Sequence, residues 1–384
     1  MGDNRPMTQR IGFPDAIRGL AALSVMLGHY FLIFFADNSY ISHLIGLPPL
    51  HGLVFPPWPF SLAADIGIVL GQFGVGVFFI ISGFVIPLSY DGHAGRFLLR
   101  RALRIYPVYI VGFMIVIGFV ASGDRIAGTP FPYSFWRVVS HFGVLTRGIF
   151  GFIRIDGISW TLEVEVSFYV AFALLAAAIG RWRIPFLFAA PVILEAASFL
   201  LIHRYESSGG DPTPALQLWV APLLVLGLAY YFHHQRKISA RMVILANFYV
   251  ALLLIAEWPF MRVICNGQWL VGYLVAMAVF AACYRFGAVI RPGRVLRHLS
   301  AVSYPFYVVH ALSGYAIIYF LMARGLSPVP AILIAAAVVY LCALALHLAV
   351  ERPAMRLSKA IGVHPPSTAA QPAVGERSAV PAPE

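Results

Sequence analysis

The sequence predicts an all-α, polytopic integral membrane protein: a helical bundle of about ten transmembrane helices with both termini in the cytoplasm. The first reason is composition, since 60% of the 384 residues are hydrophobic and 11% are charged, with a mean hydropathy of +0.82. Soluble domains carry about 25% charged residues. The second reason is a series of apolar runs long enough to cross a hydrocarbon layer of about 30 Å. The third is the distribution of Lys and Arg between those runs.

Ten apolar runs have the length of a transmembrane helix. They cover residues 15–36, 66–89, 105–122, 158–179, 184–202, 215–232, 242–257, 268–285, 300–322 and 329–350. One further segment, Phe135 to Phe150, is interrupted by Arg137, His141 and Arg147. We expect it to form an interfacial or re-entrant piece packed against protein, because a lipid-exposed irregular segment is too costly.

The loops between the runs predict the orientation. With the N-terminus inside, 20 of the 27 Lys and Arg fall on the inner side and 7 on the outer side. Loops rich in Lys and Arg stay in the cytoplasm, so a multi-pass protein of the bacterial inner membrane is expected. The predicted division is a cytoplasmic N-terminal segment (1–14), a transmembrane domain (15–356) and a cytoplasmic tail (357–384), whose Pro/Ala-rich sequence predicts disorder.

The net charge of +11 does not indicate a partner nucleic acid. All basic residues except Lys237 and Lys359 are arginine, and they lie in short blocks between apolar runs. That pattern is typical of membrane topology and of phosphate recognition. The three cysteines have no CxxC spacing, so neither a metal site nor a disulfide framework is expected.

The first run contains three ionisable residues, Asp15, Arg18 and His29. Eleven residues separate Arg18 from His29, which is about three helical turns, so both side chains share one helix face. His29 then lies roughly 16 Å deeper than Arg18, near the middle of the bilayer. Ionisable groups at this depth usually have a function. The alternative is a histidine held by an interhelical hydrogen bond.

Arginines gather at the inner end of the third run. Arg101 and Arg104 are three residues apart and therefore neighbours on one helix face. Together with Arg100 they offer guanidinium groups for a phosphorylated ligand on the cytosolic side. The alternative is that each arginine only marks the topology.

Two later runs supply further ionisable residues. Glu163 and Glu165 are two residues apart, so on a helix they point about 200° from each other, with Glu165 roughly 10 Å inside the outer boundary. The structural alternative for Glu165 is an ion pair with an outer arginine. His310 lies 13 residues into its run, at a depth like that of His29. Glu351 is expected to pair with an inner arginine.

Six motifs in a fixed order carry a resemblance to a known family. They are D-x-x-R-G-x-A…H, FF-x-ISGF, RR-x-x-RI-x-P, W-[ST]-L-x-V-E-x-x-FY, SY-x-x-Y-x-x-H and a final E-x-P, between about residues 10 and 355. The chain resembles the membrane-bound acyltransferase family 3. The resemblance implies a ten-helix bundle that takes an acyl group, commonly acetyl from acetyl-CoA, at the cytosolic side and passes it to a hydroxyl of a carbohydrate or small molecule.

The resemblance also assigns residues. Arg18 with His29, and Arg101 with Arg104, occupy the two functional signatures of the family, and Glu165 occupies the glutamate of the Trp-Thr-Leu motif. Asp15, Trp160 and Tyr304 lie in the same motifs and are expected to support the site. The chain departs from the family where Glu-Gln often precedes Phe-Tyr, because Val166 and Ser167 stand there.

These observations predict an integral membrane O-acyltransferase with acyl-CoA as co-substrate and no tightly bound cofactor. His29 is the expected general base or transient acyl acceptor, since imidazole titrates near neutral pH. Glu165 and His310 are its expected polarising or orienting partners, and Arg18, Arg101 and Arg104 are expected to bind the donor. The rivals are a transporter or flippase of a polysaccharide precursor, which midplane charges also fit, and an accessory protein with a decayed site.

The interpretation makes a geometric prediction. His29 and His310 are at similar depth if both helices start on the inner side, and Glu165 reaches that level from the opposite side. We therefore expect a shared polar cavity in which His29 approaches Glu165 or His310, with Arg18, Arg101 and Arg104 at its cytosolic mouth.

Overall fold

The computed structural model describes residues 12–287 and 289–361, and this part of the chain contains helices and loops but no β-strand. The elements, in chain order, are α1 Phe13–Leu27, η1 Gly28–Ile33, α2 Phe34–Ala36, α3 Asn38–Leu44, α4 Ser61–Asp65, α5 Gly67–Val85, η2 Pro87–Ser89, α6 Ala94–Ala127, α7 Phe135–His141, α8 Thr146–Ile149, α9 Ser159–Arg181, α10 Arg183–Ser208, α11 Thr213–Val220, α12 Pro222–His234, α13 Ala240–Met261, α14 Gly267–Arg285, α15 Arg294–Ala323, α16 Pro328–Leu346, η3 His347–Glu351 and α17 Arg352–Ala360.

The ten predicted spans are confirmed. Within the described residues, ten helical stretches are long and apolar enough to cross a membrane: Phe13–Ala36, Gly67–Ser89, Ala94–Ala127, Ser159–Arg181, Arg183–Ser208, Thr213–His234, Ala240–Met261, Gly267–Arg285, Arg294–Ala323 and Pro328–Ala360. The segment Phe135 to Phe150 is not among them and forms the short helices α7 and α8, which agrees with its interruption by Arg137, His141 and Arg147.

The helices at the two ends of the bundle extend slightly beyond residues 15–356. The first helix begins at Phe13, with Pro14 in its first turn, where the missing N–H of proline costs nothing. The last helix, α17, continues to Ala360. Residues 1–11 and most of the predicted tail, 362–384, lie outside the described residues.

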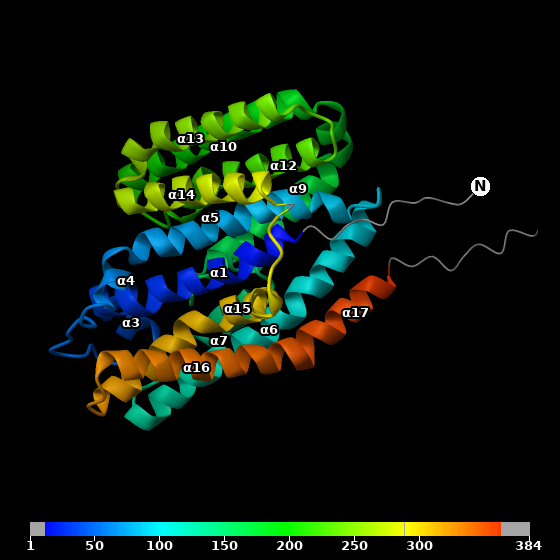
Figure 1. The fold of residues 1–384 in the computed structure, drawn as a ribbon. Coiled ribbons are helices and arrows are strands. Elements are labelled where there is room, and N and C mark those ends of the chain that lie inside the picture. The colour runs from blue at the N-terminus through cyan, green and yellow to red at the C-terminus, as the bar shows by residue number, and fades with distance from the viewer. Residues whose placement is uncertain (1–11, 288, 362–384) are drawn as a thin grey trace, which may run out of the picture.

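The helices form layers (Figure 1). Helices α10, α12, α13 and α14 lie together on one side, α6, α15 and α16 lie on the other, and α1 and α5 run between them. Helix α5 packs against α1, α12 and α14, so it joins the two sides. The start of α1 and the end of α17 lie at the same end of the bundle, which we call the terminal face.

Helices α1 and α15 lie side by side and run in the same direction. Asp15 contacts Ser300 near their starts, and the ring of His29 lies beside that of His310 further along. Gly19 makes this packing possible, because a Cβ there would stand 2.7 Å from the Cβ of Leu299. Parallel packing of two helices that start at the same face therefore brings residues of equal depth together.

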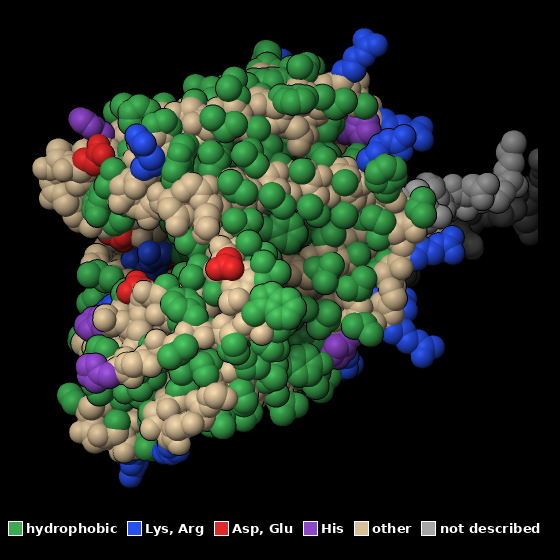
Figure 2. Space-filling view, turned by 60° about the vertical axis from the view of Figure 1, so that its left-hand side comes forward, with side chains coloured by type: hydrophobic (Ala, Val, Ile, Leu, Met, Phe, Trp, Pro, Cys, Tyr) green, Lys and Arg blue, Asp and Glu red, His purple; other side chains and the backbone are tan. Residues whose placement is uncertain are grey.

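The surface agrees with a membrane protein. Figure 2 shows hydrophobic side chains over the broad flank of the bundle and Lys and Arg gathered mainly at one end. Exposed large hydrophobic residues such as Phe248, Leu200 and Leu174 lie on the outward faces of spanning helices. In water such a surface would be an aggregation hazard, whereas in a bilayer it is the surface that lipid requires.

Candidate functional site

A cavity of about 1200 Å³ opens between the helices near the terminal face. Residues from α1, α5, α6, α9, α15 and the η3–α17 region line it. Its charged lining residues are Asp15, Arg18, Arg101, Arg104, Glu165, Arg236, Arg297 and Glu351. Five arginines against three carboxylates give the cavity a positive balance, which suits a polyanionic ligand. We call it the arginine cavity.

Two of the predicted donor-binding residues face the arginine cavity without a protein partner. Neither Arg18 nor Arg104 forms an ion pair or hydrogen bond with any residue that the structure describes. Arg18 interacts electrostatically with Arg104, Glu165 and Glu351, so these groups share one field. Two neighbouring guanidinium groups with unused donors form a site ready for phosphate.

Arg101 is buried and held more firmly. Its guanidinium donates to the hydroxyl of Ser89 and weakly to the carbonyl of Ile86, and it lies over the rings of Phe97 and Tyr169 at 5.4 and 5.3 Å. The ring faces and the short helix η2 fix its orientation. Arg101 therefore has fewer free donors than Arg104.

Arg100 does not join this group, contrary to expectation. Its guanidinium forms an ion pair with Asp91 at 3.0 Å and donates to the carbonyl of Ser89. Arg96 contacts the same carboxylate at 3.4 Å. Arg100 therefore stabilises the loop before α6 and does not line the arginine cavity.

Glu165 lies in the arginine cavity rather than beside the histidines. Its Oε1 accepts hydrogen bonds from the hydroxyls of Ser82 and Tyr169. The structure shows no contact between Glu165 and His29 or His310. Of the two partners that the sequence left open for His29, the structure therefore selects His310 and not Glu165. Tyr169 links Glu165 to Arg101, because its hydroxyl bonds the carboxylate while its ring underlies the guanidinium.

His29 and His310 are brought together, as predicted. Their ring centroids are 5.0 Å apart, and the ring of Tyr315 stacks on His29 at 5.9 Å. His29 lies in the π-helical segment η1, and such segments often mark functional sites. His310 is fully buried, whereas His29 is only partly buried. His29 is therefore the more accessible of the two imidazoles.

The hydrogen bonding of His310 defines its tautomer. Its Nδ1 lies 2.8 Å from the carbonyl oxygen of Tyr307, and a carbonyl only accepts, so Nδ1 carries the proton in the neutral ring. Nε2 then holds a lone pair and is buried without a hydrogen-bond partner. This lone pair can accept a proton or a hydrogen bond, and the neighbouring imidazole of His29 can donate one.

The histidine pair lies outside the lining of the arginine cavity, which corrects the prediction of a single shared cavity. The cavity lining includes Tyr307 and Thr161 but neither histidine. The hydroxyls of Tyr307 and Thr161 are 2.8 Å apart, and the Tyr307 ring lies 5.5 Å from that of His310. Tyr307 thus forms a wall with the cavity on one side and His310 on the other.

The three expected supporting residues have different positions. Asp15 lines the arginine cavity and accepts a hydrogen bond from Ser300 at 3.4 Å. Tyr304 also lines it, and its hydroxyl donates to the carbonyl of Ile105 at 3.0 Å. Trp160 does not line the cavity; it is buried against the ring of Phe79. Trp160 therefore supports the site through packing.

The expected pairing of Glu351 with an arginine is wrong, and the true partner was not foreseen. The Nδ1 of His347 lies 2.6 Å from Glu351, and Arg352 donates to Nε2 of the same ring at 3.1 Å. Both His347 and Glu351 line the arginine cavity within the π-helical segment η3. The only sequence signal was the Glu-Arg-Pro motif, because the i,i+4 contact depends on the local backbone.

An outer arginine does pair with a glutamate of α9, but with Glu163 rather than Glu165. Arg147 donates to both carboxylate oxygens of Glu163 at 2.8 and 3.0 Å, and Gln217 donates to Oε2 at 2.6 Å. Burial disfavours the charge of Arg147, yet the hydrogen bonds and charge of Glu163 raise the pKa of this guanidinium above its ordinary value. Glu163 therefore anchors α8 to α9 instead of facing a wet cavity.

His141, the other notable residue of this outer segment, is structural. Its Nδ1 lies 2.7 Å from the carbonyl of Arg137, and its Nε2 accepts from the backbone N–H of Ile155 at 3.0 Å. Both ring nitrogens are thus used by the backbone in the neutral state. Burial lowers the pKa of His141, although the nearby Asp156 acts in the opposite direction.

The described residues offer no group of three or more His, Cys, Asp or Glu side chains arranged to hold a metal ion. The chemistry at hand is that of guanidinium groups, carboxylates, imidazoles and tyrosine hydroxyls. Together the fold and the site define a multi-pass membrane protein with a basic cavity at one face and a histidine pair beyond it.

Comparison with known proteins agrees with this class. The family model described as "Acyltransferase domain" matches residues 11–348, so the chain belongs to the acyltransferase 3 family. Nodulation protein 10 of Rhizobium leguminosarum bv. viciae is 27% identical over 185 residues, an alignment that covers 44% of this chain and 45% of that relative. No solved structure matches the chain.

Proposed function

We propose that this protein is an O-acyltransferase of the bacterial inner membrane. It moves an acyl group, acetyl in the first instance, from acyl-CoA on the cytosolic side to a hydroxyl of a carbohydrate or small-molecule acceptor. The observation that carries the proposal is the order of three features: the guanidinium groups of Arg18 on α1 and Arg104 on α6, then Tyr307 on α15, then the pair His29 and His310. The family of the chain supports the reaction class.

The sidedness of the proposal rests on charge. The arginine cavity opens at the terminal face, and in the topology predicted from the sequence 20 of the 27 Lys and Arg lie on the same side of the membrane as the start of the first span. Cytoplasmic loops carry the excess of Lys and Arg, so the terminal face is assigned to the cytosol. Acyl-CoA is a cytosolic donor with several phosphates, and a cavity that opens to the cytosol is accessible to it.

In the donor-binding step, Arg18 and Arg104 hold phosphate oxygens of CoA. Both have unused N–H donors, and the positive balance of the cavity favours a polyanion. Arg101 supports them from its fixed position over Tyr169. Glu165 accepts hydrogen bonds from Ser82 and Tyr169 and so holds the Tyr169 ring under Arg101. It is therefore a positioning residue in this proposal.

In the transfer step, a hydroxyl oxygen attacks the thioester carbonyl directly, or His29 attacks first and passes the acyl group on. In the direct route His29 takes the hydroxyl proton, the C–O bond forms, the C–S bond breaks, and CoA leaves as a thiolate that the proton then neutralises. In the relay route a ring nitrogen of His29 attacks the carbonyl, the C–S bond breaks, and CoA leaves as a thiolate that takes up the imidazole proton. The acceptor hydroxyl then attacks the acyl-imidazole, the C–O bond forms, the C–N bond breaks, and the hydroxyl proton returns to the His29 ring. In both, Nε2 of His310 is placed to accept a hydrogen bond from the protonated His29 ring.

Reaching His29 requires the acyl group to pass Tyr307. The hydroxyl contact of Tyr307 with Thr161 closes the deep end of the arginine cavity, and the ring contacts His310 directly behind it. A rotation of one tyrosine side chain opens that route, since side-chain rotations are fast compared with typical turnover. Tyr307 is thus proposed to separate donor binding from transfer.

The proposal is tested by supplying purified protein with radiolabelled acetyl-CoA, with and without a hydroxyl acceptor. We expect label to appear on the acceptor with stoichiometric release of free CoA. The second candidate, a transporter or flippase, shares the membrane-embedded ionisable residues that motivate it. Movement of acceptor across proteoliposomes without CoA release would favour that candidate and contradict acyl transfer.

A further inference from the structure

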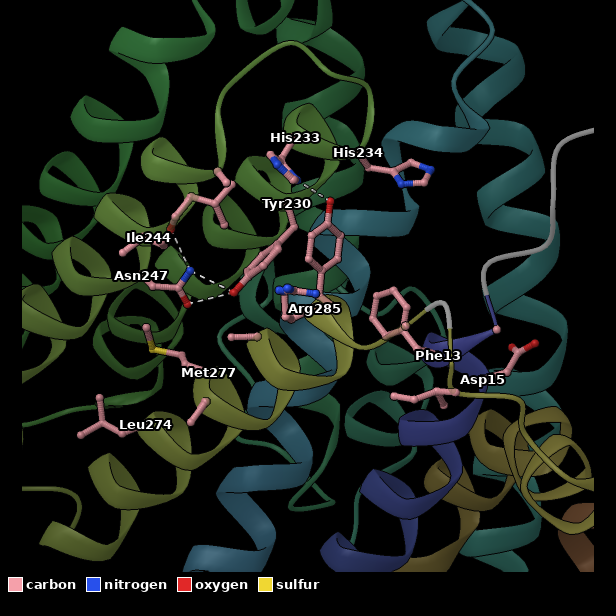
Figure 3. Close-up of a pocket in the computed structure, with 18 of the residues that line it drawn as sticks. Phe13, Asp15, Tyr230, His233, His234, Ile244, Asn247, Leu274, Met277 and Arg285 are labelled. Atoms are coloured by element: carbon pink, nitrogen blue, oxygen red, sulfur yellow. Dashed lines mark hydrogen bonds between the residues drawn. The ribbon is translucent and has the colours of Figure 1, made fainter. Parts of the chain in front are cut away.

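A second large cavity lies beside the first, between α13 and α14, and the proposed function does not use it. Its volume is about 1410 Å³, above the roughly 300–1,000 Å³ typical of small-molecule sites. Figure 3 shows its lining residues, with Asn247 from α13, Leu274, Met277 and Arg285 from α14, and Asp15 at the start of α1. We call it the side groove.

The inner wall of the side groove is effectively hydrocarbon. It is lined by aliphatic and aromatic side chains, among them Val243, Ile244, Phe248, Leu274 and Met277. Four of the polar side chains along it form hydrogen bonds with one another. Tyr230 and Asn247 exchange hydrogen bonds at 2.9 and 3.1 Å, and His233 bonds the hydroxyl of Tyr284 at 2.7 Å, as Figure 3 shows. These four side chains therefore need no polar ligand to satisfy the hydrogen bonds described.

The groove opens toward lipid. Phe248 and Ile244 of α13 are 72% and 55% exposed and lie in a spanning helix, where the surrounding medium is hydrocarbon. Along α14 the lining runs from Arg285 to Leu274, eleven residues and so about 16 Å. That length equals about half of a ~30 Å hydrocarbon layer, so the groove has the depth of one leaflet.

Positive charge is confined to the end of the groove at the terminal face. Arg285, Arg291 and Arg297 line this end, with Asp15 as the one carboxylate among its lining residues. All three arginines are exposed, and none forms an ion pair with a residue in the described part of the chain. The side groove is thus apolar over the depth of one leaflet and ends in arginines without an ion-pair partner. This arrangement suits an amphiphile with an anionic head group.

We infer that the side groove binds an anionic glycerophospholipid from the leaflet at the terminal face. The phosphate and any further acidic group of the head lie at Arg285 and Arg291, and an acyl chain runs along Ile244, Leu274 and Met277. The acyl chains of a zwitterionic lipid fit the side groove equally well, but its head group lacks the net negative charge that the arginines select. Because Asp15, His234 and Arg297 line both cavities, the bound head group lies next to the arginine cavity.

The test is lipid retention by the full-length protein, with no assay of acyl transfer. Protein reconstituted in mixed vesicles of phosphatidylglycerol and phosphatidylcholine is extracted into detergent, and the retained lipid is quantified by mass spectrometry. We expect retained phosphatidylglycerol to exceed its share of the vesicles, and the excess to fall with rising salt. In the double variant Arg285→Gln/Arg291→Gln, the preference for phosphatidylglycerol over phosphatidylcholine should fall about fivefold for each arginine removed.

Two further variants keep the result interpretable. Arg241→Gln removes one exposed positive charge at the start of α13 without touching either cavity, so it should retain the wild-type selectivity. Ala278→Trp fills the groove from an exposed position on α14 and should lower the retention of both lipids. Equal retention of the two lipids by wild type, unchanged selectivity in the double variant, or full retention in Ala278→Trp would each overturn the inference.

Discussion

The two ends of the paired helices α1 and α15 present opposite environments. At the terminal face, Asp15 and Arg18 stand in a cavity with Arg104, Glu165 and several other charges. Eleven residues further along the chain, in η1, His29 lies beside His310 and Tyr315, and no ion pair of His29 is found among the described residues. The first region is charged and open to the face, and the second is neutral and enclosed behind Tyr307.

The difference teaches how one bundle serves two tasks. Binding a soluble polyanion needs cations that are accessible from water, and such groups are costly deep in the membrane. Acyl transfer to a hydroxyl needs a neutral base and the exclusion of competing water. The arginine cavity and the histidine pair lie at different depths along α1 and α15, so each region has the environment that its task needs. The packing of the two helices fixes the position of one region relative to the other.

The largest expected effect on this comparison comes from His310. His310→Asn retains a side-chain N–H near the position of Nδ1, which can still donate to the Tyr307 carbonyl, but it removes the lone pair of Nε2. If that lone pair takes part in the proton transfer, the transfer rate should fall by on the order of 10²–10⁴-fold at normal protein abundance. Rates are measured with labelled acetyl-CoA. A wild-type rate in His310→Asn would assign His310 to packing alone.

The next largest effect concerns stability outside both regions. Glu163→Gln breaks the buried pair with Arg147 and leaves that guanidinium with only the longer contact to Asp211 at 3.8 Å, so it should lower the free energy of unfolding by up to about 3–5 kcal/mol. Glu165→Gln is the matched control, two residues along the same helix, and it should be better tolerated because its partners Ser82 and Tyr169 are neutral. Thermal unfolding in detergent compares them. Equal losses would show that the two glutamates have the same structural role.

A moderate effect on donor binding is expected from the arginines. Arg104→Lys keeps the charge but loses the planar fork, so it should raise the KM for acyl-CoA several-fold more than the KM for the acceptor. Arg101→Lys should do the same and also reduce stability, because it loses the contacts with Ser89 and the two rings. Steady-state kinetics against both substrates check this. Unchanged donor KM with altered topology would make both arginines topology markers.

The smallest effect is expected from Arg100. Its partner Asp91 lies in a partly exposed loop, and pairs of this kind contribute about 0–1 kcal/mol. Arg100→Gln should therefore leave donor KM within twofold of wild type and shift the melting temperature only slightly. A donor KM that rises as much as in Arg104→Lys would place Arg100 in the binding site after all.

The sequence predicts most of this organisation because it depends on depth. Hydropathy locates the ten spans, and residue counting from the inner end places His29 beside His310, since α1 and α15 start at the same face. The motifs of the family place Arg18, Arg101 and Arg104 together. These predictions succeed because each needs only the position of a residue along a straight helix.

The remaining features depend on the rotation and tilt of helices far apart in sequence. Glu165 accepts a hydrogen bond from Ser82 of α5, and Arg100 forms an ion pair with Asp91 in the loop before α6. The wall between the two regions needs Tyr307 of α15 to meet Thr161 of α9. The side groove exists because α13 and α14 leave a space between them. No periodicity in a single segment contains this information.

The most direct test of the central claim, that His29 carries the chemistry while the arginine cavity holds the donor, is acetyl transfer by the His29→Ala variant measured alongside its binding of acetyl-CoA. We predict that the variant inserts and accumulates like wild type and binds acetyl-CoA with unchanged affinity. Its transfer rate should fall by on the order of 10²–10⁴-fold, the typical contribution of a general base. Wild-type turnover at equal membrane abundance, or a loss of only about twofold, would contradict the account.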